Sequence, residues 1–134
     1  MRYYPIEIRF SDIDTMGHVN NAVYLSYFEL ARMKFFRDVV GSNWNWKKHG
    51  IILARNEIDY QKPIFLTDRI KIGVGTESIG NKSFTLVYDV QKEVDGSWVS
   101  CAKGKSVSVC FDHELKTTVA VPEAWIKILS LVQV

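Results

Sequence analysis

Side chains able to do chemistry are concentrated in one short segment, Asp12 to Asn21, which reads Asp-Ile-Asp-Thr-Met-Gly-His-Val-Asn-Asn. It holds two acids, a histidine and two asparagines, and an apolar helix is predicted to begin directly after it. The unpaired N–H groups and the dipole of a helix N-terminus attract negative charge. A carboxylate beside backbone donors that can point at a carbonyl oxygen is a minimal site for acyl transfer. The segment therefore predicts an acyl-transfer site built on a carboxylate.

The acyl transfer that such a simple site can support is the hydrolysis of a thioester. A departing amine must be protonated, so amide hydrolysis needs a good general acid. A thiol, with a pKa of roughly 8.5, leaves as a thiolate near neutral pH with little help. The sequence has no Ser-His-Asp order, no G-x-S-x-G elbow and no H-E-x-x-H motif that would indicate another hydrolytic route. The residues thus favour thioesters over amides.

The element that must position this segment is a long helix predicted over residues 22–39, with Asn20 or Asn21 as its N-cap. Its first ten positions contain only one serine and one glutamate as polar residues, so apolar side chains point around nearly the whole circumference. A helix that is apolar on most sides is enclosed by other structure. We therefore expect the remaining elements to surround it.

Five strands are predicted from the alternation of apolar and polar residues, one before the helix and four after it. Their approximate ranges are 6–10, 51–61, 70–74, 83–90 and 98–111. Asp95-Gly96 indicates a tight hairpin, and a slip in the alternation around Gly104 indicates a β-bulge. Pro122 opens a short C-terminal helix that ends near Leu131. The predicted fold class is α+β, with an antiparallel five-stranded sheet wrapped around one long buried helix and a short C-terminal helix after it.

Length and composition limit the class of protein. The 134 residues fit a single domain over residues 1–134. Lys and Arg exceed Asp and Glu by 17 to 15, which suits an anionic small ligand but is too weak to indicate nucleic acid. We find no leader-like segment and no apolar run of membrane-spanning length. Cys101 and Cys110 lack C-x-x-C spacing and are expected to be buried reduced thiols, so we expect a cytoplasmic protein with no nucleic-acid or membrane partner.

The run from Phe10 to Leu25, followed by Phe28 to Arg32, resembles the signature of hotdog-fold acyl-CoA thioesterases of the 4-hydroxybenzoyl-CoA thioesterase type. The likeness covers almost the full chain, with comparable segments at 57–60, 79–84 and 119–122. The resemblance implies a hotdog fold, an acyl-CoA substrate and a site at a subunit interface, hence a homodimer or a dimer of dimers. Nothing in the sequence indicates a metal or another cofactor.

Carried over by position, the resemblance assigns Asp14 as the catalytic carboxylate, acting as nucleophile or as general base on water. The backbone N–H around Asn21 matches the donor that polarises the thioester carbonyl, and loss of one such donor typically costs on the order of 3 kcal/mol. His18 is the third candidate catalytic residue. Lys82 falls where some members place basic residues that contact CoA phosphates. The other expected substrate contacts are Gly17, Tyr24, Glu29 and Tyr60.

Some of these residues also have a purely structural interpretation. His18 either orients water or Asp14, or stabilises the loop. Glu29 is either a second acid near the substrate or the partner of Arg32 in an ordinary helix-surface pair, which is the interpretation we prefer. Lys82 is most simply a solvated turn residue. The side chains that we consider for the acyl pocket are Tyr24, Tyr27, Phe28, Tyr60 and the Trp44–Trp46 loop.

Three further groups are interpreted as structural. Asp12 is expected to hydrogen-bond within the loop. The aromatic and basic residues from Trp44 to His49 have the composition of a platform for single-stranded nucleic acid, but a loop over the pocket or plain surface fits better. Asp112-His113-Glu114 contains metal-capable side chains without partners, so a turn is expected there.

Four functions remain open from the sequence. The first is hydrolysis of an acyl-CoA, and the second is the same reaction on an acyl carrier protein. The third is a hotdog hydratase or dehydratase, in which an Asp and a His lie close in sequence; here the proline of that motif is missing and Gly17 occupies the loop. The fourth is a non-catalytic acyl-CoA binder, which would be stabilised by ligand without turnover. Only the first two release a thiol.

Overall fold

The computed structural model describes residues 1–134 and contains six strands, two α-helices and one short 3₁₀ turn. Along the chain these elements are β1 (Arg2–Ile6), η1 (Phe10–Asp12), α1 (Val23–Val40), β2 (Gly50–Tyr60), β3 (Ile70–Ile79), β4 (Ser83–Val94), β5 (Ser97–Asp112), β6 (Thr117–Thr118) and α2 (Glu123–Leu131). The predicted order of strand, long helix, four strands and short helix is confirmed. The two-residue β6 is an additional strand.

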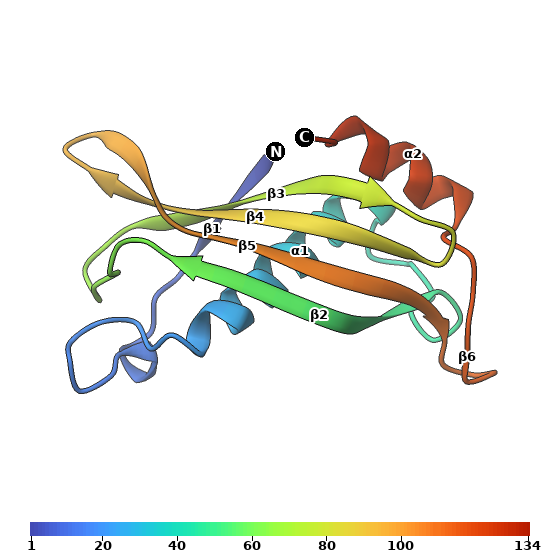
Figure 1. Ribbon diagram of the computed structural model, residues 1–134, viewed down its shortest axis with the longest axis horizontal. Helices are drawn as coiled ribbons and strands as arrows, with labels where there is room; N and C mark the ends of the chain where they lie inside the picture. The colour runs from blue at the N-terminus through green and yellow to red at the C-terminus, as the bar shows by residue number, and fades with distance from the viewer.

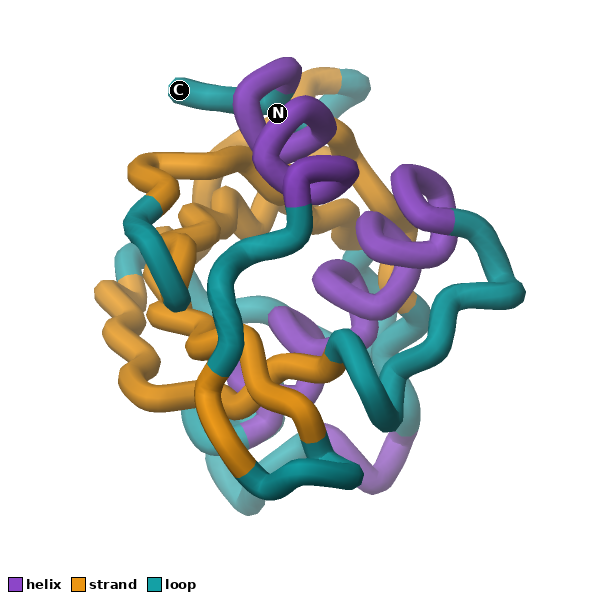
Figure 2. The backbone as a smooth tube through the Cα atoms, turned by 90° about the vertical axis from the view of Figure 1, so that its right-hand side faces the viewer, coloured by secondary structure: helices purple, strands orange, loops and turns teal.

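The strands form one antiparallel sheet in the order β1-β3-β4-β5-β2, with β6 paired to β5 (Figure 1). Seen from the side, the strands curve around one side of α1 (Figure 2). Tight turns let the consecutive strands β3, β4 and β5 pair directly, whereas β2 pairs with β5 and not with β3, the next strand along the chain. The sheet therefore presents one curved inner face to the helix.

The first strand lies earlier in the chain than the sequence predicts. It spans Arg2–Ile6 instead of residues 6–10, and the chain then leaves the sheet and turns through η1. The alternation of Ile6, Ile8 and Phe10 is misleading because Phe10 is exposed and Asp12, two residues later, is buried. The departure from the sheet carries Asp12 under α1.

Helix α1 buries one broad side against the inner face of the sheet, through Tyr24, Tyr27, Phe28, Ala31, Arg32, Phe35 and Phe36. The prediction of a helix enclosed on nearly all sides is wrong for this single chain. Leu25, Leu30 and Met33 on its outer side are exposed. The sequence shows that these positions are apolar, but it does not show whether the same chain or another molecule covers them.

Gly104 on β5 lies directly against a side chain of α1. A Cβ atom at this position would overlap the ring of Phe28, which stacks on Tyr88 with ring centroids 4.3 Å apart. The β-bulge predicted at Gly104 is wrong, since the register shifts of the sheet fall around Ala54, Glu77 and Cys101. Glycine is needed here for close approach and not for a bend.

Strand β2 forms an edge of the sheet and pairs only with β5. Its side chains are largely open to solvent, including Ile52 and Leu53, and α1 does not cover this strand. An unpaired edge with exposed apolar residues is a template for pairing with another strand. This open edge lies alongside the N-terminal end of α1, where Tyr60 meets Tyr24.

An aromatic cluster closes the other end of α1. Trp44 and Trp46 pack against Trp125 of α2, with ring centroids 5.4 and 5.7 Å apart, and Phe36 of α1 completes the group. The Trp44–Trp46 loop is therefore part of the core at the end away from Asp14, and neither a pocket lining near Asp14 nor an exposed nucleic-acid platform. No helix of the chain combines the length and apolarity that crossing a bilayer requires.

Candidate active site

Residues 13–19, here called the Asp14 loop, form a tight closed turn. A bridge joins the first and last residues of the loop. Inside it, the Asp14 N–H donates to the His18 carbonyl at 2.8 Å, and the Gly17 N–H donates to the Asp14 carbonyl at 3.1 Å. Gly17 has a φ of +82°, a conformation that costs glycine little and other residues much more. Its observed role is to close the turn, and its predicted contact with substrate stays a prediction.

The carboxylate of Asp14 is held by one oxygen only. Its Oδ1 accepts the backbone N–H of Met16 at 2.9 Å and that of His18 at 3.3 Å. No donor of the chain bonds Oδ2, and the side chain is partly exposed. One oxygen thus fixes the orientation while the other remains free to attack carbon or to accept a proton from water.

The start of α1 presents a backbone donor next to this loop. The Asn20 side chain accepts the N–H of Ala22 at 2.9 Å, and the Asn20 carbonyl accepts the N–H of Val23, also at 2.9 Å. The prediction of Asn20 or Asn21 as the N-cap is wrong, because Ala22 holds that position without a side-chain cap, and Asn20 instead bonds the residue before the helix. The N–H of Asn21 has no acceptor within the chain and is exposed. It is therefore available to a ligand oxygen at the positive end of the helix dipole.

Two tyrosines join the helix start to the end of β2. The Tyr60 hydroxyl donates to the Asn21 carbonyl at 2.8 Å, and the Tyr60 ring meets that of Tyr24 edge-on at 5.0 Å. Burial, followed by the proximity of Cys101 and Tyr60, raises the pKa of Tyr24 to about 12. Burial also raises the pKa of Tyr60. Both phenols therefore stay neutral at physiological pH, and both lie beside the predicted donor.

His18 supports the loop mainly through its backbone. Its imidazole packs edge-on against Phe65 at 5.1 Å and makes no hydrogen bond to Asp14. The next residue, Val19, donates its N–H to the Ile64 carbonyl at 2.8 Å, so the segment before β3 supports the Asp14 loop from outside. These contacts favour the structural interpretation of His18. A direct part in the chemistry stays a prediction.

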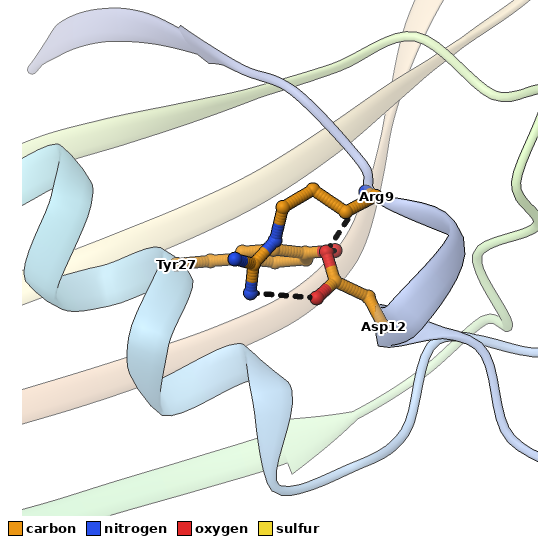
Figure 3. A network of polar contacts seen from close by, with 3 residues as sticks. All are labelled: Arg9, Asp12 and Tyr27. Atoms are coloured by element: carbon orange, nitrogen blue, oxygen red, sulfur yellow. Dashed lines mark hydrogen bonds and ion pairs between the residues drawn. The ribbon is translucent and has the colours of Figure 1, made fainter.

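Beneath the loop lies an ionic network that is buried at Asp12 and Tyr27 and open to solvent at Arg9 (Figure 3). Asp12 accepts the backbone N–H of Arg9 at 2.9 Å, the Arg9 guanidinium at 3.1 Å and the Tyr27 hydroxyl at 2.7 Å. Burial alone would raise the pKa of Asp12, but these three hydrogen bonds outweigh burial and hold it below its usual range. Burial, with Asp12 as neighbour, raises the pKa of Tyr27. The structural role expected for Asp12 is confirmed, and its partner Tyr27 is new.

The predicted pair between Glu29 and Arg32 is absent. Glu29 points to the exposed side of α1, whereas Arg32 is 4% exposed and donates to the Tyr88 hydroxyl at 3.1 Å. The preferred interpretation of a surface pair is therefore wrong, because Arg32 lies on the sheet-facing side of the helix. A contact of Glu29 with substrate stays a prediction.

Lys82 lies far from Asp14 within one chain. It occupies the turn between β3 and β4, exposed to solvent, with its carbonyl bonded to the N–H of Cys110. The Asp14 loop adjoins the opposite end of the sheet, near Tyr60 at the end of β2 (Figure 1). A single chain thus brings together Asp14, Asn21, Tyr24 and Tyr60, but not Lys82.

Metal-capable side chains do not gather anywhere in the chain, since no three of them meet in a ligand arrangement. In the Asp112-His113-Glu114 segment, Asp112 accepts the backbone N–H groups of Glu114 and Leu115 at 2.9 Å each. This is the turn that the sequence predicts.

Comparison with known proteins adds the family. The sequence profile of the thioesterase-like superfamily matches residues 8–129. The chain belongs to this superfamily. The long-chain acyl-CoA thioesterase FadM of Escherichia coli (strain K12) is 30% identical over 117 residues, which is 86% of each protein. The uncharacterized protein YsmA of Bacillus subtilis (strain 168) is 31% identical over 86 residues, which is 64% of this chain and 58% of YsmA.

Solved structures agree with this assignment. A thioesterase from Thermus thermophilus, complexed with coenzyme A and zinc, has a TM-score of 0.81 at 35% identity and covers 98% of this chain and 92% of its own. A mutant of 4-hydroxybenzoyl-CoA thioesterase, complexed with 4-hydroxybenzoyl-CoA, has a TM-score of 0.84 at 16% identity over 96% of this chain and 97% of its own, a likeness of fold alone. The predicted hotdog fold is confirmed, and this thioesterase-superfamily chain is a thioester hydrolase.

Proposed function

We propose that this chain hydrolyses acyl-CoA thioesters to the free acid and CoA, with Asp14 as the reacting carboxylate and the Asn21 N–H as the donor to the thioester carbonyl. The proposal is carried by one observation. Asp14 has one oxygen anchored by two backbone N–H groups and the other unbonded, beside a helix start whose Asn21 N–H lacks an acceptor. A held carboxylate and a free oxyanion donor are the two parts that thioester hydrolysis needs.

The reaction can follow two routes that have the same overall stoichiometry. As a general base, Asp14 takes a proton from water, whose oxygen attacks the thioester carbon. As a nucleophile, Asp14 Oδ2 attacks that carbon and water later cleaves the anhydride. In both routes the negative charge on the carbonyl oxygen is stabilised by the Asn21 N–H, and the thiolate leaves and takes up a proton. Water therefore supplies OH to the acid and H to the thiol.

Coenzyme A is the carrier that the comparisons support. FadM is named for long-chain acyl-CoA, and the Thermus thermophilus thioesterase is complexed with coenzyme A. The exposed cation of Lys82 fits a phosphate ligand better than an acyl chain. An acyl carrier protein remains the second candidate carrier, because it presents the same thioester on the same phosphopantetheine arm.

A second copy of the chain would complete the site. We infer that β2 pairs antiparallel with β2 of another copy, because it is an unpaired edge with exposed Ile52 and Leu53. Two-fold antiparallel pairing sets the Tyr60 end of one strand beside the Gly50 end of the other. The second copy's Lys82, at that far end of its sheet, would then approach the Asp14 loop.

The test is thiol release from a panel of short, medium, long and aromatic acyl-CoAs, and from acyl carrier protein loaded with the same acyl groups. Asp14→Asn keeps the shape of the side chain and the anchoring of Oδ1. We expect it to lose at least ~100-fold in kcat, as removal of a general base or nucleophile does. Asp95→Asn is the matched control, since Asp95 lies at a hairpin tip with a φ of 51°, which Asn tolerates well.

The outcomes separate the candidates. Turnover of acyl-CoA that is lost in Asp14→Asn and kept in Asp95→Asn supports the proposal. Turnover of acyl carrier protein substrates alone would show that the carrier is acyl carrier protein and not CoA. Unchanged activity in Asp14→Asn would exclude Asp14 as the reacting carboxylate and make Glu29 and His18 the next candidates. Single turnover in ¹⁸O-labelled water then tests the nucleophilic route, because label in the Asp14 carboxylate requires that water cleaved an anhydride at the Asp14 carbon.

A further inference from the structure

Asp12 contacts both the Asp14 loop and the helix. Its side chain, 1% exposed, accepts the Tyr27 hydroxyl of α1 at 2.7 Å, while its backbone carbonyl accepts the N–H of Asn20 at 2.8 Å. The first of these bonds ties Asp12 to the helix, and the second joins the two ends of the segment that carries Asp14. No other side-chain hydrogen bond joins η1 or the Asp14 loop to α1.

The same helix carries the other half of the site. Asn21 lies just before α1, and Tyr27 follows about one and a half turns later on a rigid element. A fixed bond from Tyr27 to Asp12 therefore sets the Asp14 loop relative to the Asn21 N–H. Without the Tyr27 hydroxyl, the Asp14 carboxylate and the Asn21 N–H would both still be present, but the distance between them would be less firmly fixed.

The third member of the network has a smaller part. Arg9 is 70% exposed on its side chain, so its guanidinium is solvated and contributes little to holding Asp12. Tyr27 is buried, and burial leaves its hydroxyl no water to bond in place of Asp12. The bond from Tyr27 to Asp12 is thus the one that fixes the Asp14 loop relative to the helix.

We propose that Tyr27 and Asp12 act as positioning residues that hold Asp14 at the correct distance from the Asn21 N–H, an inference that rests on the proposed function. In this role both residues act through the Asp14 loop, to which Asp12 is joined directly and Tyr27 through its hydroxyl. Because a misplacement of about 1 Å in a catalytic group can cost on the order of a hundredfold in rate, a loosened loop lowers kcat substantially while the binding of CoA is unchanged.

The decisive variant is Tyr27→Phe, which removes only the hydroxyl. We expect kcat to fall about tenfold with KM for the best acyl-CoA changed less than twofold. Tyr4→Phe is the control, since Tyr4 on β1 is also buried and its hydroxyl makes no bond to the segment that carries Asp14. A loss of kcat in Tyr27→Phe that exceeds any loss in Tyr4→Phe at matched Tm supports positioning.

Substitutions of Asp12 test the same Tyr27–Asp12 hydrogen bond from the acceptor. Asp12→Asn keeps an acceptor for the Tyr27 hydroxyl and should retain more kcat than Asp12→Ala. Adding Tyr27→Phe to Asp12→Ala should cost nothing further, because the bond is already gone. Full additivity of the two substitutions would overturn the proposal, as would wild-type kcat in Tyr27→Phe.

Amide hydrogen exchange gives a readout that needs no turnover. The Asp14 and Asn20 N–H groups are hydrogen-bonded within the segment that Asp12 anchors. We expect both to exchange faster in Tyr27→Phe than in Tyr4→Phe, and equal protection would reject the inference. If Asp14→Asn is fully active while this exchange effect is present, the proposed chemistry fails and the positioning of the loop stands.

Discussion

Two aspartates separated by one residue have been given opposite environments. Asp12 is buried and accepts hydrogen bonds on both oxygens, whereas Asp14 is partly exposed with one oxygen unbonded. A carboxylate whose acceptor sites are occupied cannot attack or take up a proton without breaking its contacts. The chain thus contains one acid suited to structure and one suited to chemistry, distinguished by their burial and hydrogen bonding.

The lowered pKa of Asp12 predicts a specific acid sensitivity. Its folded pKa lies below the unfolded value of about 3.9, so the unfolded chain binds this proton more readily. Its contribution to stability is complete above about pH 3.9 and is lost as the pH falls further, through the folded pKa. We expect the free energy of unfolding in urea to drop more steeply below pH 4 in the wild type than in Asp12→Asn. Parallel curves would contradict this.

At the residue scale, the sequence could single out Asp14 as the candidate acid but not the contacts that support it. The motif around Asp14 is local, so it is readable from spacing. The bond between Tyr27 and Asp12 joins residues fifteen apart and requires both the turn of η1 and the rotation of α1, neither of which spacing reveals. The spacing rule failed for Glu29 and Arg32 because it assumes that both side chains face water.

At the scale of elements, the contact between Phe28 of α1 and Gly104 of β5 is made possible by a missing side chain. Gly104→Ala would place a methyl group against the Phe28 ring, which is itself stacked on Tyr88. We expect a loss of about 1–3 kcal/mol in the free energy of unfolding, the usual cost of overpacking a core. Urea denaturation measures it. Phe28→Leu added to Gly104→Ala should recover part of the loss, and a fully additive pair would count against this contact.

Element types were predictable and their exact placement was less so. The long helix, the four sequential strands and the C-terminal helix follow from periodicities of 3.6 and 2 residues, which are properties of the local chain. The start of β1 was misplaced because an apolar alternation continues after the strand has ended. The bulge was misplaced because a glycine in a strand has two explanations, bending and close approach, which the sequence does not distinguish.

At the scale of the whole molecule, the open edge of β2 predicts self-association. Ile52 on this strand is 42% exposed, and we expect Ile52→Glu to weaken the dimer because it places charges at a strand–strand junction. Light scattering after size exclusion should show a larger monomer fraction, with thioesterase activity lost in parallel. Ile126→Glu on α2 is the control, at 40% exposure and away from β2. An unchanged dimer in Ile52→Glu would exclude this edge as the interface.

Self-association is also where prediction from sequence reaches its limit. Apolar residues at Leu25, Leu30 and Met33 indicate burial, and the structure of one chain leaves them exposed. An exposed apolar patch indicates a binding surface, but its hydrophobicity does not identify the molecule that binds there. The expectation of a homo-oligomer came from the family resemblance, because composition alone does not indicate one.

The open edge of β2 also has a consequence for the life of a newly made chain. A folded monomer would already hold Asp14 and the Asn21 N–H, but the cation at Lys82 would be at the wrong end of its own sheet. On the proposed dimer, such a chain would bind the CoA phosphates weakly on leaving the ribosome, and its first encounter with a second copy would complete the site. Turnover at low acyl-CoA concentration would therefore rise with the concentration of the chain itself.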